Sequence, residues 1–339
     1  MVKTEQKSAV NVVFGSMTFG REGAGQARVH DLETAGKILD VFQRHGHYEV
    51  DTARVYCGGS CEEMLGDLGW QKRGLQMDTK LYPTARSPVN MGWTDVITHS
   101  PEDIRKNFDN SLKALKADRV DAFYLHAPDR ETPYEETLRA VNEIHKEGKF
   151  DRFGISNYAA HEVAEMVMIC RQHGWIQPTM FQVIYNALHR AIEPELVPCC
   201  RKFGLGLFCF NPLGGGFLSG KMSKEAAVEA GSRFDPEKAQ GKSYRARYWH
   251  DQMFEAVEQL KEIGKKHDLT VPEIALRWMT HHSVLKREHG DAVIIGASSL
   301  AHIEQNLLDL EKPALPEEVV KAVDAAYAVA KPSNSKYFH

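Results

Sequence analysis

Short apolar runs alternate along this chain with longer stretches in which apolar residues recur every three or four positions. Short runs rich in β-branched and aromatic residues are typical of buried strands, and the longer spacing predicts amphipathic helices. The stretch from Asp31 to His45 is a clear case, because Leu32, Ala35 and Phe42 share one helical face. The chain is therefore expected to alternate between strands and helices.

The pattern predicts eight strands, and a helix follows most of them. The predicted strands are residues 12–15, 48–51, 75–80, 120–125, 150–155, 179–184, 206–210 and 292–295. The predicted helices are residues 31–45, 62–68, 101–116, 134–146, 160–173, 193–203, 272–281, 300–310 and 316–330. Strand–helix repeats of this kind predict parallel strand pairing.

Eight such units favour a closed (β/α)8 barrel of the α/β class, with extra helices at the C-terminal end. The main rival is an open, doubly wound sheet, which would want a Gly-x-Gly-x-x-Gly turn after its first strand. Residues 15–20 read Gly-Ser-Met-Thr-Phe-Gly and do not supply that turn. No low-complexity linker or shift in composition divides the chain, so residues 1–339 are expected to form a single domain.

Composition excludes several classes of function. A net charge of −4 over 339 residues gives no global attraction to nucleic acid or to an anionic membrane. No apolar run approaches the ~20 residues that a transmembrane helix needs, so no membrane partner is expected. The first residues lack a signal-peptide core, and the six cysteines are scattered, which favours a reduced, cytoplasmic protein over a disulfide framework.

The sequence gives little support for a metal site. Cys57 and Cys61 are spaced like half of a zinc site, but no second pair of Cys or His residues complements them. His281 and His282 are adjacent, and neighbours on a helix point to different faces. We therefore expect no metal ion, and we interpret the two histidines as surface residues at a helix end.

Four titratable residues lie at or just after the ends of three successive predicted strands: Asp51, Tyr56, Lys80 and His126. The C-terminal ends of neighbouring parallel strands meet at one face of a barrel, and barrel enzymes keep their chemistry there. A phenol, an ammonium, a carboxylate and an imidazole together make a site that can donate a proton. These residues are the candidate catalytic group.

Two late segments predict a phosphate site. Residues 211–221 follow the seventh strand, and their run of glycines lets backbone N–H groups approach a ligand, while Lys221 adds positive charge. Residues 296–300 follow the eighth strand and open a helix whose free N–H groups favour an anion. Barrel enzymes often build a phosphate site from these two loops.

With these features the chain resembles the aldo-keto reductases over nearly its whole length, and it is most similar to the branch of aflatoxin-aldehyde and succinic semialdehyde reductases. The segments that carry the resemblance are residues 123–129, 211–213, 244–249, 275–279, 296–306 and 337–338. The resemblance implies a barrel that binds NADPH in an extended form without a Rossmann domain. It also implies a small-molecule carbonyl substrate and a homodimer.

The resemblance assigns a chain of residues to NADPH. They are Ser156, Asn157, Gln182, Phe210, Asn211, Leu213, Gly214, Gly215, Lys221, Arg233, Gly296, Ser298, His302, Gln305 and Asn306. The first three would hold the nicotinamide carboxamide, Phe210 would stack on its ring, and the 211–221 segment would hold the pyrophosphate. Arg233, Ser298, His302, Gln305 and Asn306 would surround the adenosine 2′-phosphate. Arg233 is the main candidate for selecting NADPH over NADH, because the extra phosphate needs a basic partner.

The same resemblance gives the catalytic residues their roles. Tyr56 would donate the proton, and the Lys80 ammonium would lower the pKa of its phenol. Asp51 would hold Lys80 through a salt bridge. His126 would hydrogen-bond the substrate oxygen and orient it.

Substrate contacts are expected from fewer residues. Met17, Tyr82 and Trp93 would wall an apolar pocket, and Arg247 would meet the carboxylate of an acidic aldehyde. Related chains often end in arginine where this one has His339, so acidic substrates should be handled less well, or only at lower pH. The loop over residues 83–100 also departs from the family pattern, which leaves the substrate open.

The expected function is NADPH-dependent reduction of aldehydes, reactive ketones or dicarbonyls, as in detoxification. Two alternatives from other classes remain. In a class I aldolase, Lys80 would form a Schiff base, although Asp51 beside it would keep the amine protonated. In an NADPH-binding redox sensor, the cradle would bind the cofactor with little turnover.

Overall fold

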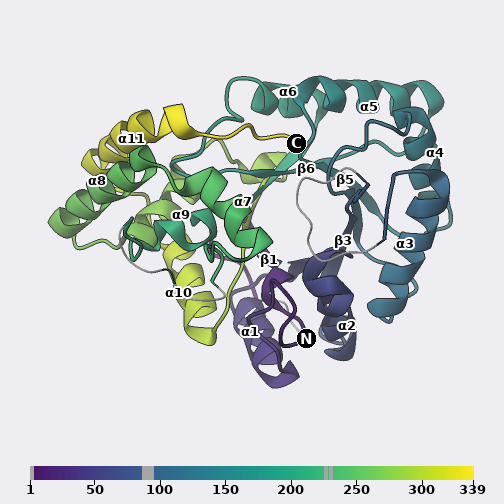
Figure 1. The fold of residues 1–339 in the computed structure, drawn as a ribbon, viewed down its shortest axis with the longest axis horizontal. Coiled ribbons are helices and arrows are strands. Elements are labelled where there is room, and N and C mark those ends of the chain that lie inside the picture. The colour runs from purple at the N-terminus through teal and green to yellow at the C-terminus, as the bar shows by residue number, and fades with distance from the viewer. Residues whose placement is uncertain (1–3, 86–94, 225–227, 229–231) are drawn as a thin grey trace.

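The strands of this protein form a closed parallel barrel (Figure 1). The computed structural model describes residues 4–85, 95–224, 228 and 232–339. The strands are β1 (Asn11–Gly15), β2 (Glu49–Asp51), β3 (Gln76–Leu81), β4 (Ala122–Leu125), β5 (Arg152–Ser156), β6 (Met180–Ile184), β7 (Gly206–Phe210) and β8 (Ala292–Ile295). They pair in chain order, and β1 closes the ring on β8 with Val12 opposite Val293. The predicted (β/α)8 barrel is confirmed, and the doubly wound sheet is excluded.

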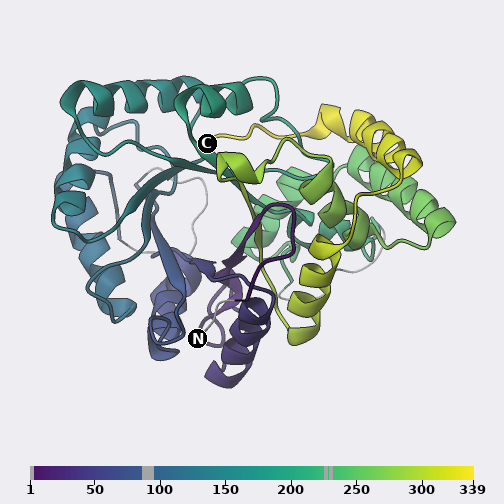
Figure 2. The same ribbon diagram turned by 180° about the vertical axis from the view of Figure 1, so that it is seen from behind.

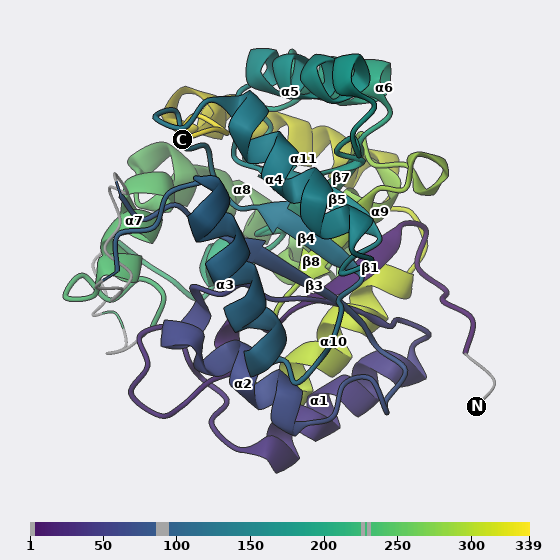
Figure 3. The same cartoon turned by 90° about the vertical axis from the view of Figure 1, so that its right-hand side faces the viewer.

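Helices surround the barrel, as Figures 1 and 2 show from opposite sides. Those that follow the strands are α1 (Leu32–Arg44), α2 (Ser60–Asp67), α3 (Pro101–Ala114), α4 (Tyr134–Lys146), α5 (Ala160–His173), α6 (Leu196–Phe203), α9 (Val271–His281) and α10 (Leu300–Glu311). In Figure 3 α5 and α6 lie above the strands and α1 lies below them. The additional helices are α7 (Ala239–Tyr248), α8 (Asp251–His267) and α11 (Glu317–Ala330). No helix in the described part of the chain has the length and apolar character to cross a membrane.

Two helices between β7 and β8, α7 and α8, lie outside the predicted set. Helix α7 has a faint pattern, because only Gly241, Tyr244 and Tyr248 of its ten residues are buried. Helix α8 does carry an apolar stripe, which includes Met253 and Leu260, so its periodicity was open to prediction. It packs against α11 at the edge of the molecule, and both helices lie outside the barrel ring (Figure 1).

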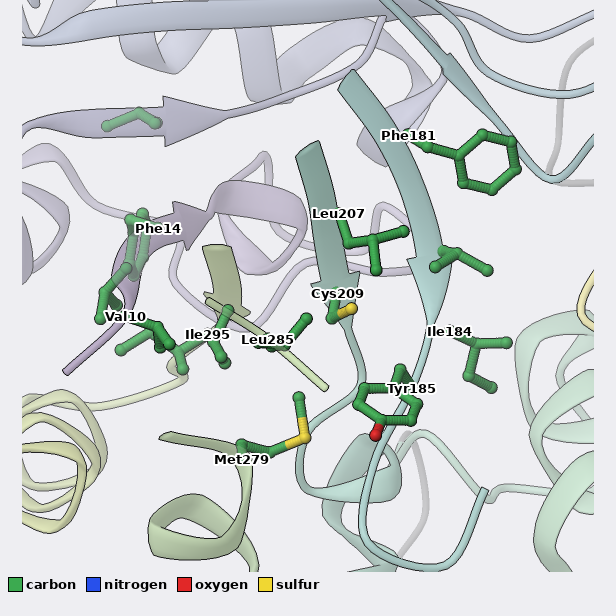
Figure 4. Packing of buried hydrophobic residues seen from close by; sticks show 14 of the residues in the cluster. Val10, Phe14, Phe181, Ile184, Tyr185, Leu207, Cys209, Met279, Leu285 and Ile295 are labelled. Carbon is green, nitrogen blue, oxygen red and sulfur yellow. The ribbon is translucent and has the colours of Figure 1, made fainter. Parts of the chain in front are cut away.

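Alternation along the strands divides the core into two parts. On β1, Phe14 belongs to the large cluster between strands and helices, and Val13 belongs to a smaller cluster of residues from β1, β4, β6, β7 and β8. On β7, Leu207 and Phe208 divide in the same way. Figure 4 shows part of the outer cluster, with Leu207 on β7, Phe14 on β1 and Met279 from α9. The smaller cluster fills the barrel interior, so the barrel is a packed core with its site at one end.

The segment after α11 crosses back toward the barrel, and Figure 1 shows the C-terminus near β6. Ser335 Oγ lies 3.1 Å from His189 Nε2, and the Tyr337 hydroxyl donates to Glu195 at 2.7 Å. The His339 backbone N–H donates to the Asn157 carbonyl at 3.0 Å. These bonds fix the last residues beside the ends of β4, β5 and β6.

Gly154 on β5 supplies a test of the packed interior. Its register partner is Tyr124 on β4, and a Cβ atom at position 154 would overlap the Tyr124 ring. Because Tyr124 is fully buried, Gly154→Ala is expected to lower the free energy of unfolding by about 1–3 kcal/mol, measured by urea denaturation. Gly25→Ala is the matched control, since no atom lies within 4 Å of the added methyl group, and it should change stability by less than about 0.5 kcal/mol. Equal stability of the two variants would contradict tight packing at Tyr124.

Candidate active site

A buried ion pair joins the ends of β2 and β3. Asp51 is the last residue of β2, and the Lys80 ammonium donates to both of its carboxylate oxygens at 2.6 Å. A third acceptor for the ammonium is the Thr52 carbonyl at 2.7 Å. The Lys80 side chain is 0% exposed, so all three of its N–H groups need these partners. The ammonium is therefore fixed in one place and orientation.

Tyr56 and His126 lie beside this ion pair. Tyr56 begins a short 3-10 turn (Tyr56–Gly59) after β2, and Lys80 Nζ lies 4.9 Å from the centre of its ring. His126 follows β4, and its ring meets the Tyr56 ring edge-on with 5.7 Å between centroids. Tyr82 contacts the His126 ring in the same edge-on manner, at 5.2 Å. The structure thus brings the four candidate catalytic residues together at the C-terminal end of the barrel.

The pKa of the Tyr56 phenol shifts in the direction opposite to the one expected from the sequence. Burial raises this pKa well above its usual value, and the negative charge of Asp51 acts in the same direction. The expected net lowering of this pKa is wrong, because burial dominates and the charge of Asp51, which holds the ammonium in a bidentate pair, offsets the effect of Lys80. Tyr56 is therefore a fully protonated acid at neutral pH.

His126 is a neutral imidazole. Burial lowers its pKa well below the usual value, and the positive charge of Lys80 acts in the same direction. Its backbone N–H donates to the Leu81 carbonyl at 2.9 Å, which places the ring above β3. Among the described residues Nδ1 is buried and has no partner. A neutral ring with one N–H can donate a single hydrogen bond to a carbonyl oxygen without adding charge.

A second buried ion pair fixes the turn that carries Tyr56. Arg54 donates to Glu62 Oε2 at 2.7 Å, and the Thr79 hydroxyl donates to Glu62 Oε1 at 2.6 Å. The Glu62 side chain is 0% exposed. These bonds connect the segment before Tyr56, the start of α2 and the residue before Lys80. The sequence did not reveal this role, because Glu62 and Glu63 both open a helix and their spacing does not tell the buried acid from the exposed one.

The cysteines near Tyr56 join the turn to the β1–α1 loop. Cys57 Sγ lies 3.2 Å from the Met17 carbonyl, and Cys61 Sγ lies 3.2 Å from the Ser16 carbonyl. Burial raises the pKa of the Cys61 thiol to about 11, so both sulfur atoms act as weak donors and not as thiolates. Among the described residues no group of three His, Cys, Asp or Glu side chains is placed to hold a metal ion.

Two of the four residues expected at the nicotinamide, Asn157 and Gln182, contact the catalytic group. Asn157 follows β5 with a positive φ of 64°, and its amide nitrogen donates to the His126 carbonyl at 2.9 Å and to Ser156 Oγ at 3.0 Å. Gln182 on β6 donates from Nε2 to Asp51 Oδ1 at 2.7 Å. Phe210 ends β7 and is partly buried against the interior cluster. These four side chains come from β5, β6 and β7 and the residue after β5, on the other half of the barrel.

The loop after β7 has the backbone that a pyrophosphate needs. It contains a short 3-10 turn (Gly214–Ser219) that follows Leu213, and Gly214 and Gly215 have positive φ values of 59° and 68°. A Cβ atom at Gly215 would overlap the Tyr244 ring, so only glycine lets the backbone lie there. Asn211 Nδ2 is buried and has no partner among the described residues, and Lys221 is exposed at the end of the loop. An unpartnered amide donor in a glycine-rich turn, with a lysine at its end, fits an anionic ligand.

The loop after β8 completes this cradle. The Arg233 guanidinium lies 3.7 Å from the point that a Cβ at Gly296 would occupy, so the two loops meet. Ser298 Oγ lies 3.0 Å from His302 Nδ1 at the start of α10. Two of the expected residues have contacts within the protein: Asn306 donates to the Gly296 carbonyl at 3.5 Å, and Gln305 donates to Asp309 at 2.9 Å. Arg233, Ser298 and His302 are thus the side chains available to a phosphate group.

Some, but not all, of the residues expected to contact the substrate lie at the site. Met17 and Tyr82 lie beside the catalytic group, whereas Trp93 falls outside the described residues. Arg247 is partly buried, lies 5.9 Å from the centre of the Tyr244 ring and has no acidic partner in the described part of the chain.

His339 reaches the site from the C-terminal segment. Desolvation lowers the pKa of its imidazole to about 4, and the positive charges of Arg247 and Arg130 act in the same direction. Arg130 holds His339 in this position, a contact that the sequence did not predict. The Arg130 guanidinium pairs with Glu162 and donates to the His339 carbonyl at 2.8 Å.

Comparison with known proteins agrees with this geometry. Residues 11–328 match the model of the aldo/keto reductase family. The chain is 44% identical to the aldo-keto reductase pigE of Monascus ruber, with 98% of both chains covered. It is 41% identical to human aldo-keto reductase family 7 member A3, with 96% of both chains covered. It is also 41% identical to mouse aflatoxin B1 aldehyde reductase member 2, over 96% of this chain and 87% of that protein. The chain therefore belongs to the aldo/keto reductase family, whose members are NADP-dependent oxidoreductases.

Proposed function

We propose that this protein reduces aldehydes, and reactive ketones or dicarbonyls, to alcohols with NADPH, and that Tyr56 is the general acid. The observation that carries the proposal is the convergence of Tyr56, His126 and the Asp51–Lys80 ion pair at one end of the barrel. A carbonyl that accepts a hydride becomes an alkoxide, which is a stronger base than a phenolate. Tyr56 can therefore give up its proton to the alkoxide even though its pKa is raised.

The residues around the barrel mouth fit the cofactor of the family. Bound NADPH would supply the hydride. Ser156, Asn157 and Gln182 would hold the nicotinamide carboxamide, with Phe210 against the ring. The unpartnered amide of Asn211, the backbone of residues 213–215 and Lys221 would hold the pyrophosphate. Arg233, Ser298 and His302 would hold the adenosine 2′-phosphate, while Gly296, Gln305 and Asn306 shape that loop.

The catalytic side chains have separate tasks in this proposal. His126 donates a hydrogen bond to the carbonyl oxygen as a neutral ring and holds it near the Tyr56 hydroxyl. Once Tyr56 has lost its proton, the Lys80 ammonium stabilises the phenolate through space across the 4.9 Å that separates Nζ from the ring centre. Asp51 keeps Lys80 charged and in place.

Arg247 extends the proposal to the substrate. A partly buried guanidinium with no acidic partner in the described part of the chain favours a substrate that carries a carboxylate. His339 does not reinforce this charge at neutral pH, because its pKa lies near 4. Acidic aldehydes should therefore be accepted through Arg247 without a contribution from His339.

The aldolase alternative conflicts with the state of Lys80. A Schiff base requires a neutral amine that is free to attack, but this ammonium is bound by three acceptors at 2.6–2.7 Å. Borohydride in the presence of a carbonyl substrate should therefore fail to trap an adduct on Lys80. The sensor alternative concerns turnover, and kinetics separate it from the reductase.

Replacement of the proton donor tests the mechanism. Tyr56→Phe should lower kcat for 4-nitrobenzaldehyde, 9,10-phenanthrenequinone and succinic semialdehyde about a hundredfold or more, because the alkoxide loses its acid. NADPH oxidation followed by absorbance measures the rate, and fluorescence quenching measures the NADPH Kd, which should stay unchanged. Tyr48→Phe is the matched control, since Tyr48 precedes β2 at the opposite end of the barrel, and it should keep wild-type turnover. Wild-type protein that binds NADPH without turnover would favour the sensor.

Replacement of Arg233 tests the cofactor cradle. Arg233→Ala should raise the Kd for NADPH by about tenfold or more, because the 2′-phosphate loses a charge-assisted hydrogen bond. NADH lacks that phosphate and is the matched ligand, so its Kd should change by less than about twofold in the same titration. An equal loss of affinity for both ligands would place Arg233 elsewhere in the cofactor site.

A further inference from the structure

The side chain of Gln182 spans the mouth of the barrel. Gln182 belongs to β6 and Asp51 to β2, strands on opposite sides of a ring that pairs in chain order. The hydrogen bond between Gln182 Nε2 and Asp51 Oδ1 measures 2.7 Å and joins residues 131 positions apart. Both side chains are buried. This bond connects the half of the site assigned to the cofactor with the half that holds the proton donor.

The hydrogen bonds around Asp51 form a closed network. Oδ1 accepts from Lys80 and from Gln182, and Oδ2 accepts from Lys80. All three N–H groups of Lys80 have acceptors, so the ammonium cannot turn to another group without breaking a bond. The side-chain hydrogen bond that Gln182 makes in the described part of the chain comes from Nε2 and leaves the amide oxygen without a side-chain or backbone donor. One end of this amide acts on Asp51, and the other end is free for a ligand.

Asp51 in turn acts on Tyr56. Its negative charge opposes the phenolate that forms when Tyr56 gives up its proton. A donor that shares the charge of a carboxylate weakens this opposition. The strength of the bond from Gln182 therefore bears on how readily Tyr56 releases its proton.

We propose that Gln182, which is already expected to meet the carboxamide of the bound cofactor, is a positioning residue that acts on Tyr56 through Asp51. A carboxamide N–H donated to the Gln182 amide oxygen polarises this amide and strengthens the bond from Nε2 to Asp51. Cofactor binding and proton donation are coupled through one side chain. This inference rests on the proposed reductase function.

A double-mutant cycle with Gln182→Met and Asp51→Asn tests the coupling. Methionine has a similar volume and no amide, and asparagine removes the charge of Asp51. At saturating NADPH, Gln182→Met should lower kcat about tenfold in the wild-type background, the low end for loss of one hydrogen bond to a charged group. It should lower kcat less than about twofold in the Asp51→Asn background, because the charge through which it acts is gone. The NADPH Kd, measured by fluorescence without substrate, should rise in both backgrounds.

Ser156→Ala is the matched control. Ser156 would also contact the carboxamide, but its hydroxyl accepts from Asn157 and has no bond to Asp51. Its effect on kcat should be the same factor in both backgrounds. Thermal unfolding of all variants checks that each is folded.

Gln182→Glu gives a second measurement that does not depend on methionine packing. It keeps the shape of glutamine, but an ionised carboxylate cannot donate to Asp51 and repels it. The kcat deficit relative to wild type should shrink as pH falls, because a protonated Glu side chain can donate again. A deficit that is constant with pH, or a cycle in which Gln182→Met costs the same factor in both backgrounds, would overturn the coupling. Absence of wild-type turnover, or an active Tyr56→Phe variant, would instead overturn the proposed function.

Discussion

The ion pair between Asp51 and Lys80 is the interaction on which the site depends. Removing two charges from water is unfavourable, and their mutual attraction offsets this only when the geometry is good and the remaining donors are satisfied. Here the ammonium has three acceptors at 2.6–2.7 Å, and the carboxylate has a further donor in Gln182. The closed barrel allows this arrangement. It places β2 next to β3, and it brings Gln182 on β6 into hydrogen-bond contact with Asp51 on β2 across the mouth.

The barrel interior below the site limits the charge near that ion pair. Arg152 donates to Glu49 at 2.9 Å and lies 3.3 Å from an oxygen of Asp78, while the other Asp78 oxygen is buried without a partner in the described chain. Burial, and then the negative charge of Glu49, raise the pKa of Asp78 well above its usual value. The Arg152 guanidinium contacts both acids, so its positive charge offsets theirs near Asp51. The net charge that Tyr56 experiences is thus set mainly by the pair at the barrel mouth.

The sequence predicted the fold and the catalytic group well because both depend on local patterns. Each strand is an apolar run, and parallel pairing brings the polar residues at the strand ends to one face. The bond from Gln182 to Asp51 has no local pattern, because it depends on how far apart opposite strands lie across the mouth. Nor does spacing tell Glu62 from Glu63, since only the packed position of α2 makes one of them a buried partner for Arg54.

The sign of the pKa shift at Tyr56 shows why composition alone misleads at such a site. A lysine beside a tyrosine favours the phenolate, but here burial and then the charge of Asp51 outweigh the ammonium and raise the pKa of the phenol. The acid therefore stays protonated until an alkoxide forms beside it. The ammonium cannot help by a direct bond either, because its N–H groups are all engaged. The remaining influence on Tyr56 is how strongly hydrogen bonds weaken the negative charge of Asp51. Besides Lys80, Gln182 is the one side chain in the described part of the chain that donates to this carboxylate.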